Sequence, residues 1–144
     1  MRFEFSAGGV VLKKTDGKVE ILVCQHSQHH GWVFPKGLID PSTSSGRAET
    51  KEEAALREVK EETGINGKII KSLSPIEYWY KLNNEKIKKT VYYFLMEYDS
   101  GDTKVHDFEM ENGEWLPMDK VEERLTYKSD KEVWKEADKL ISNY

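Results

Sequence analysis

Long apolar runs, paired cysteines and an excess of positive charge are all missing from this chain of 144 residues. A single cysteine, Cys24, cannot form an internal disulfide, which favours a reducing compartment. Near the N-terminus the longest apolar run is Ala7–Leu12, far short of the ~20 residues that cross a bilayer, and it lacks the layout of a signal peptide. The sequence therefore predicts a cytoplasmic protein without a membrane segment.

The charge balance is mildly acidic, with 22 Lys and Arg against 26 Asp and Glu and a formal net charge of −4. A chain with this balance does not hold nucleic acid by bulk attraction to phosphate, so we expect no stable nucleic-acid complex. Hydrophobic residues make up 38% of the chain, enough to bury a core and to argue against disorder. The length suits one domain, which we expect to span residues 1–144.

Two β-hairpins are predicted from turn residues that separate β-rich runs. In the first, Phe3–Leu12 and Val19–Gln25 flank an Asp-Gly pair, a strong hairpin signal. In the second, Ile69–Tyr80 and Lys86–Tyr98 flank the turn-prone residues 82–85. Short strands are further expected at Trp32–Phe34 and Glu114–Leu116.

Three helix starts carry a capping residue followed three positions later by an acid. They are Thr50 with Glu53, Asp119 with Glu122, and Ser129 with Glu132. The first helix is expected to run to about Glu62 and to end at Gly64. The last helix carries an apolar stripe that is typical of core packing. Strands on both sides of a central helix, with a helix at the end, predict an α/β fold in which helices sandwich a mixed sheet.

The first predicted helix places three carboxylates, those of Glu58, Glu61 and Glu62, within an arc of about 100°. Like charges this close oppose folding unless a cation neutralises them. Hard oxygen ligands in this arrangement suit Mg²⁺ or Mn²⁺. The alternative is a solvated helix whose acids pair with neighbouring Lys and Arg residues, and the spacing alone leaves both interpretations open.

A longer pattern surrounds these acids. Glu49, seven intervening residues and then the segment Arg57–Ile65 resemble the signature of the Nudix hydrolase family at every fixed position after the opening glycine. The natural opening glycine is Gly37, but eleven residues separate it from Glu49 where the family pattern has five, so we expect a lengthened loop at about Pro41–Gly46. The resemblance implies an α/β/α sandwich with a mixed central sheet.

Five further segments look like the diadenosine polyphosphate hydrolases of that family. They are Phe5–Val10, Trp32–Gly37, Tyr78–Tyr80, Lys89–Met96 and Leu125–Asp130. This resemblance implies a Mg²⁺-dependent enzyme, with Mn²⁺ as a second possibility, that cleaves the small-molecule nucleotide diadenosine tetraphosphate to ATP and AMP. Three alternatives stay open: a nucleoside triphosphate pyrophosphohydrolase that clears damaged nucleotides, an RNA 5′-end pyrophosphohydrolase, and a nucleotide sensor without turnover. The oligomeric state is left open.

The same resemblance implies roles for individual acids and their neighbours. Arg57 would orient carboxylates, and its helical spacing points to Glu53 and Glu61 as its partners. Glu49 would add a ligand or orient the loop. Glu109 would serve as a further metal ligand or general base, with Glu111 and Glu114 as competing candidates. The implied metal ligands are Gly37 through its carbonyl, Glu58, Glu61, Glu62 and Glu109, of which Glu61 and Glu62 would lie closest to the catalytic cations.

A polyphosphate substrate also needs cations and a flat surface for its base. Lys36 is the first candidate for a phosphate contact, with Lys81 and Lys89 as second candidates. Base stacking is expected on tyrosines, each of which could equally be a packed aromatic. The stacking candidates are Tyr78, Tyr80 and Tyr127. The histidines at positions 26, 29 and 30 are interpreted as a solvated loop rather than a metal site, although one of them could approach the substrate.

Overall fold

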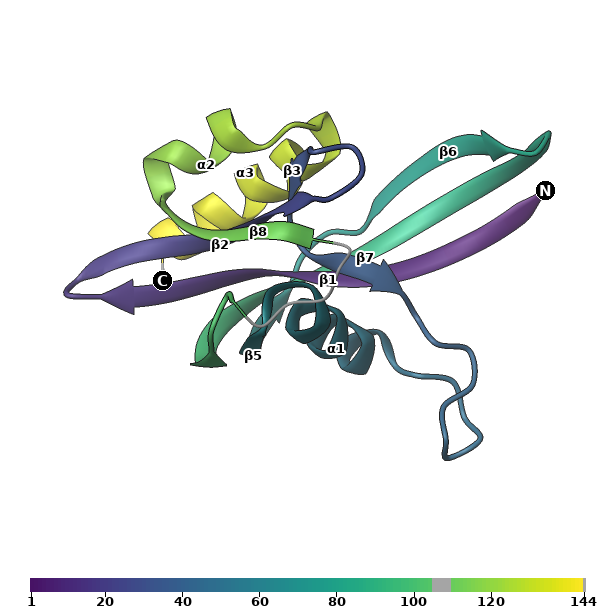
Figure 1. Cartoon of the computed structure of the whole chain (residues 1–144), viewed down its shortest axis with the longest axis horizontal. Helices are drawn as coiled ribbons and strands as arrows, with labels where there is room; N and C mark the ends of the chain where they lie inside the picture. The colour runs from purple at the N-terminus through teal and green to yellow at the C-terminus, as the bar shows by residue number, and fades with distance from the viewer. Residues whose placement is uncertain (105–109, 144) are drawn as a thin grey trace.

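The computed structural model describes residues 1–104 and 110–143. Its centre is a mixed eight-stranded sheet, with helix α1 (Lys51–Thr63) on one face. Helices α2 (Met118–Arg124) and α3 (Lys128–Ser142) cover the opposite face (Figure 1). This arrangement confirms the predicted α/β sandwich. None of the described helices is long and apolar enough to span a membrane.

The sheet combines one parallel pairing with several antiparallel pairings. Strands β3, β2, β1, β7 and β5 follow one another across it, while β4 pairs with β1, β6 with β7, and β8 with β2. The parallel pair is β1 with β7. The strands are β1 (Arg2–Thr15), β2 (Lys18–His26), β3 (Trp32–Val33), β4 (Lys36–Leu38), β5 (Ile65–Ser72), β6 (Ile76–Leu82), β7 (Glu85–Gly101) and β8 (Met110–Pro117).

Both predicted hairpins form, and their turns explain why. The β1–β2 turn has positive φ at Asp16 and Gly17, and the β6–β7 turn has positive φ at Asn83 and Asn84. Two such residues in succession suit the two-residue hairpin turns whose twist matches that of the strands.

Several strand boundaries were predicted wrongly, for example that of Glu114–Leu116, which is part of the longer β8, and two of the differences have a visible cause. The expected strand Ile69–Tyr80 is divided into β5 and β6, and the break contains Pro75, which has no N–H to donate to a sheet. The strand expected at Trp32–Phe34 ends one residue earlier, because the Phe34 N–H donates to the side chain of Asp130 instead.

Helix α1 begins and ends as predicted. Thr50 and Glu53 form a reciprocal capping box, and Gly64 ends the helix with φ of 79°. The other two predicted caps are wrong, since Asp119 and Ser129 lie inside α2 and α3, which begin after Pro117 and Tyr127 without a side-chain cap.

Contacts from distant residues fix the start of α3. Thr126 Oγ1 accepts a hydrogen bond from the Trp32 N–H at 2.8 Å, and the Thr126 N–H donates to the Trp32 carbonyl at 3.1 Å. The chain therefore enters α3 at a point set by β3.

Two apolar cores lie on the two faces of the sheet. Alternate residues of β1 divide between them, because side chains along a strand point to opposite faces. Val10 and Leu12 pack in the core that includes the α3 residues, and Ala7 and Val11 pack against α1. The α3 stripe is core, as predicted, with Val133, Trp134, Ala137 and Ile141 buried. Cys24 is buried as well.

Candidate functional site

The acids of α1 differ sharply in exposure. Glu58 and Glu62 are only 9% and 2% exposed. The side chain of Glu61 is 49% exposed. Two buried acids do not fit the interpretation of α1 as a solvated charged face, because carboxylates are buried only where partners compensate for the lost hydration.

Strand β4 supplies the surface against which the buried acids pack. The Glu62 carboxylate accepts a hydrogen bond from the Lys36 N–H at 3.2 Å. The carboxylate of Glu58 lies against Gly37, where a Cβ would stand only 2.1 Å from its Oε2 atom. Position 37 therefore requires glycine, because any side chain there would collide with the Glu58 carboxylate. Gly37 lies beside the acidic helix despite the longer loop.

Arg57 organises the carboxylates around it. Its guanidinium donates to both oxygens of Glu49 at 2.7 and 2.9 Å, to Glu58 at 2.6 Å and to Glu61 at 3.2 Å. It also donates to the Leu38 carbonyl at 3.0 Å. The hydrogen bonds to Glu49 and then Glu58 hold the pKa of Arg57 above its usual range. Since a guanidinium has five N–H donors and all have partners here, this geometry suits the carboxylate-orienting role predicted for Arg57.

One predicted partner of Arg57 is wrong. Glu53 binds Arg47 instead, in a two-pronged ion pair at 2.8 and 2.9 Å. That pair lowers the pKa of Glu53 to about 2, with Arg47 as the main cause. Helical spacing allows a contact between Glu53 and Arg57. Arg47, in the loop before α1, binds the exposed Glu53 side chain instead.

Glu49 closes the base of the long loop. The Glu49 carboxylate accepts from the Asp40 N–H at 3.0 Å, and the Glu49 N–H donates to the Asp40 carbonyl at 2.8 Å. Arg57 lowers the pKa of Glu49 through their hydrogen bond. Both carboxylate oxygens are thus engaged, which favours the loop-orienting role over the ligand role. Beyond this closed base, the loop projects away from the sheet (Figure 1).

The donor chemistry of α1 fits a hard divalent cation. Glu58, Glu61 and Glu62 offer carboxylate oxygens beside β4, and Mg²⁺ is commonly bound through one or two carboxylates together with water and substrate phosphates. As they stand, however, these side chains are not gathered around one point: within residues 1–104 and 110–143, His, Cys, Asp and Glu form no group of three or more that could hold a metal ion. Arg57 holds Glu58 and Glu61, and the Lys36 N–H holds Glu62, so metal binding requires these carboxylates to turn towards one another. Glu109, the predicted additional ligand, lies outside the described residues.

The two acids that compete with Glu109 have other partners. His30 Nδ1 lies 2.5 Å from Glu111 Oε1. Glu114 accepts a hydrogen bond from Arg124. Both acids are exposed. Their contacts are with His30 and Arg124 and not with the α1 carboxylates.

Two of the predicted lysines meet beside β4. Lys36 and Lys89 line a cavity of about 300 Å³ together with Gly37, Leu38 and Glu58. Burial and then the charge of Lys36 lower the pKa of Lys89. We call this the phosphate cavity, because it brings two cations next to the carboxylate face. Lys81 is not among its lining residues and pairs across the β6–β7 hairpin with Lys86.

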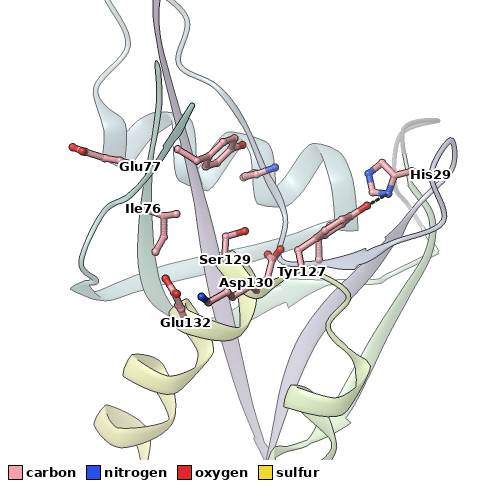
Figure 2. Close-up of a pocket in the computed structure, with 11 residues that line it drawn as sticks. His29, Ile76, Glu77, Tyr127, Ser129, Asp130 and Glu132 are labelled. Atoms are coloured by element: carbon pink, nitrogen blue, oxygen red, sulfur yellow. Dashed lines mark hydrogen bonds between the residues drawn. The ribbon is translucent and has the colours of Figure 1, made fainter. Parts of the chain in front are cut away.

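A larger cavity of about 530 Å³ lies on the α3 side, and Lys36 lines this cavity too. Two of the predicted stacking residues, Tyr78 and Tyr127, line it and are 36% and 40% exposed. Figure 2 shows Tyr127 beside His29 at the rim, where the tyrosine hydroxyl and His29 Nδ1 are 3.0 Å apart. We call this the base pocket, since it combines half-exposed aromatic rings with a neighbouring cation.

Tyr80 is not among the residues that line the base pocket. Its ring centre lies 6.3 Å from that of Tyr78, and its hydroxyl donates to the Glu4 carboxylate. That hydrogen bond is the main cause of a raised pKa at Tyr80. The structure therefore gives Tyr80 a contact with β1 rather than a place in the pocket.

Most residues that line the base pocket were not among the predicted site residues, and two of them, Asp130 and His29, carry titratable groups with shifted pKa values. Asp130 is 4% exposed, and its Oδ1 accepts from the Phe34 N–H at 3.2 Å. Burial raises the pKa of Asp130. His29 stacks on His26 with ring centres 4.2 Å apart, and burial followed by the charge of His26 lowers its pKa. Asp130 ends a segment that carries the family resemblance, so that signal was present in the sequence.

Known proteins resemble this chain in sequence. Residues 4–138 match the family model described as NUDIX domain. The putative mutator protein MutT4 of Mycobacterium tuberculosis is 34% identical over 144 residues, covering 96% of this chain, while the chain spans only 56% of that relative's length. The asymmetrical bis(5′-nucleosyl)-tetraphosphatase of Caenorhabditis elegans is 30% identical over 115 residues, with 79% of each protein covered.

A solved structure also resembles the whole fold. The crystal structure of a C. elegans Ap4A hydrolase binary complex has a TM-score of 0.73 and 22% sequence identity, with 98% of this chain and 99% of that chain covered. At this identity the likeness establishes the shared architecture of sheet and helices.

Proposed function

Because the chain belongs to the NUDIX family, we propose that it is a divalent-metal-dependent hydrolase that cleaves dinucleoside polyphosphates, chiefly diadenosine tetraphosphate, to ATP and AMP. The observation that carries this proposal is Lys36, which lines both the phosphate cavity and the base pocket. A nucleotide whose base occupies the pocket therefore has its phosphates directed past a lysine towards the α1 carboxylates.

The proposed metal ligands are the carboxylates of Glu58, Glu61 and Glu62 and the carbonyl of Gly37. When bound, Mg²⁺ offsets the charge of phosphate oxygens and lowers the pKa of a bound water, so that hydroxide is available near neutral pH. Arg57 fixes the orientation of Glu58 and Glu61, since its guanidinium donates to both.

The two lysines of the phosphate cavity compensate for the phosphate charge that the metal does not offset. Lys36 and Lys89 are placed to neutralise phosphate oxygens as point charges. Tyr78 and Tyr127 provide the ring faces for the base, and stacking on an aromatic contributes ~1–3 kcal/mol. Binding and chemistry are thus assigned to different side chains.

The proton of the attacking water needs a carboxylate within reach. Glu61 is the exposed member of the α1 acids and holds one hydrogen bond from Arg57, at 3.2 Å. Because Glu61 is also a proposed metal ligand and Arg57 holds one of its oxygens, we assign the acceptor role to Glu109, the base that the sequence predicts.

A second candidate function is the removal of pyrophosphate from a nucleoside triphosphate. It is favoured by the similarity to a protein that acts on a nucleoside triphosphate, the 8-oxo-(d)GTP phosphatase of Mycolicibacterium smegmatis, which is 30% identical over 115 residues, or 80% of this chain and 32% of that protein. In this case the base pocket would hold the single base of the substrate. No second nucleoside would extend beyond the phosphate cavity.

We also propose that the protein works in the cytoplasm without a stable nucleic-acid partner. The buried thiol of Cys24 and the formal charge of −4 support this.

Product analysis separates the two functions. The protein is incubated with Mg²⁺ and either diadenosine tetraphosphate or a nucleoside triphosphate, and the products are resolved by anion exchange. We expect ATP and AMP from the dinucleotide, and no turnover when excess chelator is present. If the dinucleotide survives while a triphosphate gives its monophosphate and pyrophosphate, the second function is the correct one.

A further inference from the structure

A third cavity, of about 540 Å³, lies where the N-terminal end of β1 meets the segment after β4. Phe3, Phe5 and Leu38 line it, and they are 55%, 46% and 54% exposed. We propose that this cavity binds the second nucleoside of a dinucleoside polyphosphate. The inference rests on the proposed function and extends it from one nucleoside to both.

Continuity along β4 is the first argument. The phosphate cavity shares Lys36 with the base pocket and Leu38 with the third cavity. A strand rises ~3.3 Å per residue, so these two residues are about 7 Å apart along β4. The cavities therefore follow one another along the strand, with the lysines and the Glu58 carboxylate in the middle, which is the order of groups in a molecule with a base at each end and phosphates between.

Size is the second argument. The third cavity, about 540 Å³, is nearly equal to the base pocket, about 530 Å³. Both lie in the range of roughly 300–1,000 Å³ that is usual for small-molecule sites. Two cavities of one size on either side of a phosphate cavity suit a substrate whose two ends are alike.

The chemistry of the lining residues is the third argument. Phe3 and Phe5 lie two residues apart on β1 and so point to the same face of the sheet. Exposed aromatic side chains that gather in a concave surface mark a binding site more often than single exposed residues do. Arg2 and Asp40 also line the cavity and offer a donor and an acceptor to a ribose or base.

Trp79 on β6 provides a matched control. Its side chain is 48% exposed, close to the values for Phe3 and Phe5, but it is not among the residues that line the three cavities. Its replacement therefore removes a similar exposed aromatic surface without touching the proposed nucleoside site.

The test measures binding of two non-hydrolysable ligands by calorimetry. One is methylene-bridged diadenosine tetraphosphate, and the other is methylene-bridged adenosine tetraphosphate, which has one base. We expect Phe3→Ala and Phe5→Ala to weaken binding of the dinucleotide by about 5- to 150-fold, the range that corresponds to one lost stacking contact. Binding of the one-base ligand should stay unchanged, and Trp79→Ala should affect neither ligand.

A conservative variant guards against misfolding. Phe5→Leu keeps an apolar side chain and removes the ring face. It should therefore also weaken binding of the dinucleotide while leaving binding of the one-base ligand unchanged. Equal weakening of both ligands, or no weakening of either, would overturn the proposal. No binding of the dinucleotide to the unaltered protein would overturn it as well.

Turnover of the unaltered protein tells the two proposals apart. If diadenosine tetraphosphate is not cleaved but the phenylalanine variants still lose only the dinucleotide ligand, the proposed function fails and the second nucleoside site stands. If the substrate is cleaved to ATP and AMP while Phe3 and Phe5 make no difference to binding, the function stands and the second site fails.

Discussion

The acids on the α1 side of the sheet and the aromatic rings of the base pocket differ in how firmly other side chains hold them. On the α1 side, Glu49, Glu58 and Glu61 all accept hydrogen bonds from Arg57, and Glu58 and Glu62 are buried. On the α3 side, the base pocket is bordered by half-exposed aromatic rings. The Tyr127 ring is held there by a hydrogen bond between its hydroxyl and His29 Nδ1.

This difference matches two different tasks. A carboxylate that serves metal-assisted chemistry must be held in place, because small displacements are costly for catalysis. A surface that stacks on a base needs area and access more than exact orientation, since every base has a flat face. Changes on the α1 side should therefore lower kcat, and changes on the α3 side should raise KM.

Among substitutions outside the proposed metal ligands, the largest expected effect on kcat is that of Arg57→Lys. A lysine keeps the charge but cannot hold Glu49, Glu58 and Glu61 at once, so we expect kcat to fall by about 10- to 100-fold. Steady-state kinetics with diadenosine tetraphosphate measure this. Arg47→Lys is the control, because Arg47 binds Glu53 at the surface, and its kcat should be unchanged. A kcat for Arg57→Lys equal to that of the unaltered protein would show that the network does not position the acids.

A smaller effect is expected for Tyr127→Phe. The ring remains, but the hydroxyl contact with His29 is lost, and one such hydrogen bond contributes about 1 kcal/mol. We expect KM to rise by no more than about fivefold with kcat unchanged, because this contact holds the ring in place and does not itself touch the substrate. A fall in kcat without a change in KM would place Tyr127 in the chemistry rather than in base binding.

Asp130 allows a test by pH. Its pKa is raised in the folded state by burial, so folding favours the protonated form and its contribution to stability falls as the pH rises from about 4 towards the raised value. Asp130→Asn removes this titration. The free energy of unfolding of the variant, relative to the unaltered protein, should therefore increase across that pH window and then level off. Urea unfolding at several pH values measures it.

The control for this pH test is Asp119→Asn. Asp119 is exposed in the first turn of α2, so this variant reports the effect of an Asp→Asn substitution without the loss of a buried group. A constant difference between Asp130→Asn and the unaltered protein would mean that Asp130 titrates as an ordinary carboxyl.

The smallest effect is expected from deletion of Ser42–Gly46. The loop base is closed by Asp40 and Glu49, and shortening a loop changes its closure entropy by less than ~1 kcal/mol. We expect kcat and the free energy of unfolding to change little. A large loss of kcat would show that the loop gates the site, contrary to the hydrogen bonds that close its base.

Local signals account for the parts of the fold that the sequence predicted correctly. The Asp16-Gly17 and Asn83-Asn84 turns follow from residues that tolerate positive φ, and the Thr50 capping box involves neighbours in sequence. The starts of α2 and α3 were missed, and at α3 hydrogen bonds from the distant Trp32 hold the entry to the helix. Local pattern carries no information about such contacts.

In the site, too, local sequence predicted some features, while contacts between distant segments decided others. Spacing was enough to gather Glu58, Glu61 and Glu62 on α1, but it could not show that two of them are buried against β4. It also could not separate Tyr78, which lines the base pocket, from Tyr80, whose hydroxyl is held by Glu4. Both tyrosines share a strand and a face, so only the position of β1 distinguishes them.

The most direct test of this division of labour is a comparison of Glu61→Gln with Tyr127→Ala on diadenosine tetraphosphate at saturating Mg²⁺. Gln keeps the shape of Glu61 and removes its charge, so we predict a kcat reduced by at least about 100-fold with little change in KM. Tyr127→Ala removes a stacking surface, so we predict a KM raised by about 5- to 150-fold with kcat preserved. If both variants lower kcat alone, or if Glu61→Gln turns over normally, the separation of chemistry on α1 from recognition on the α3 side is contradicted.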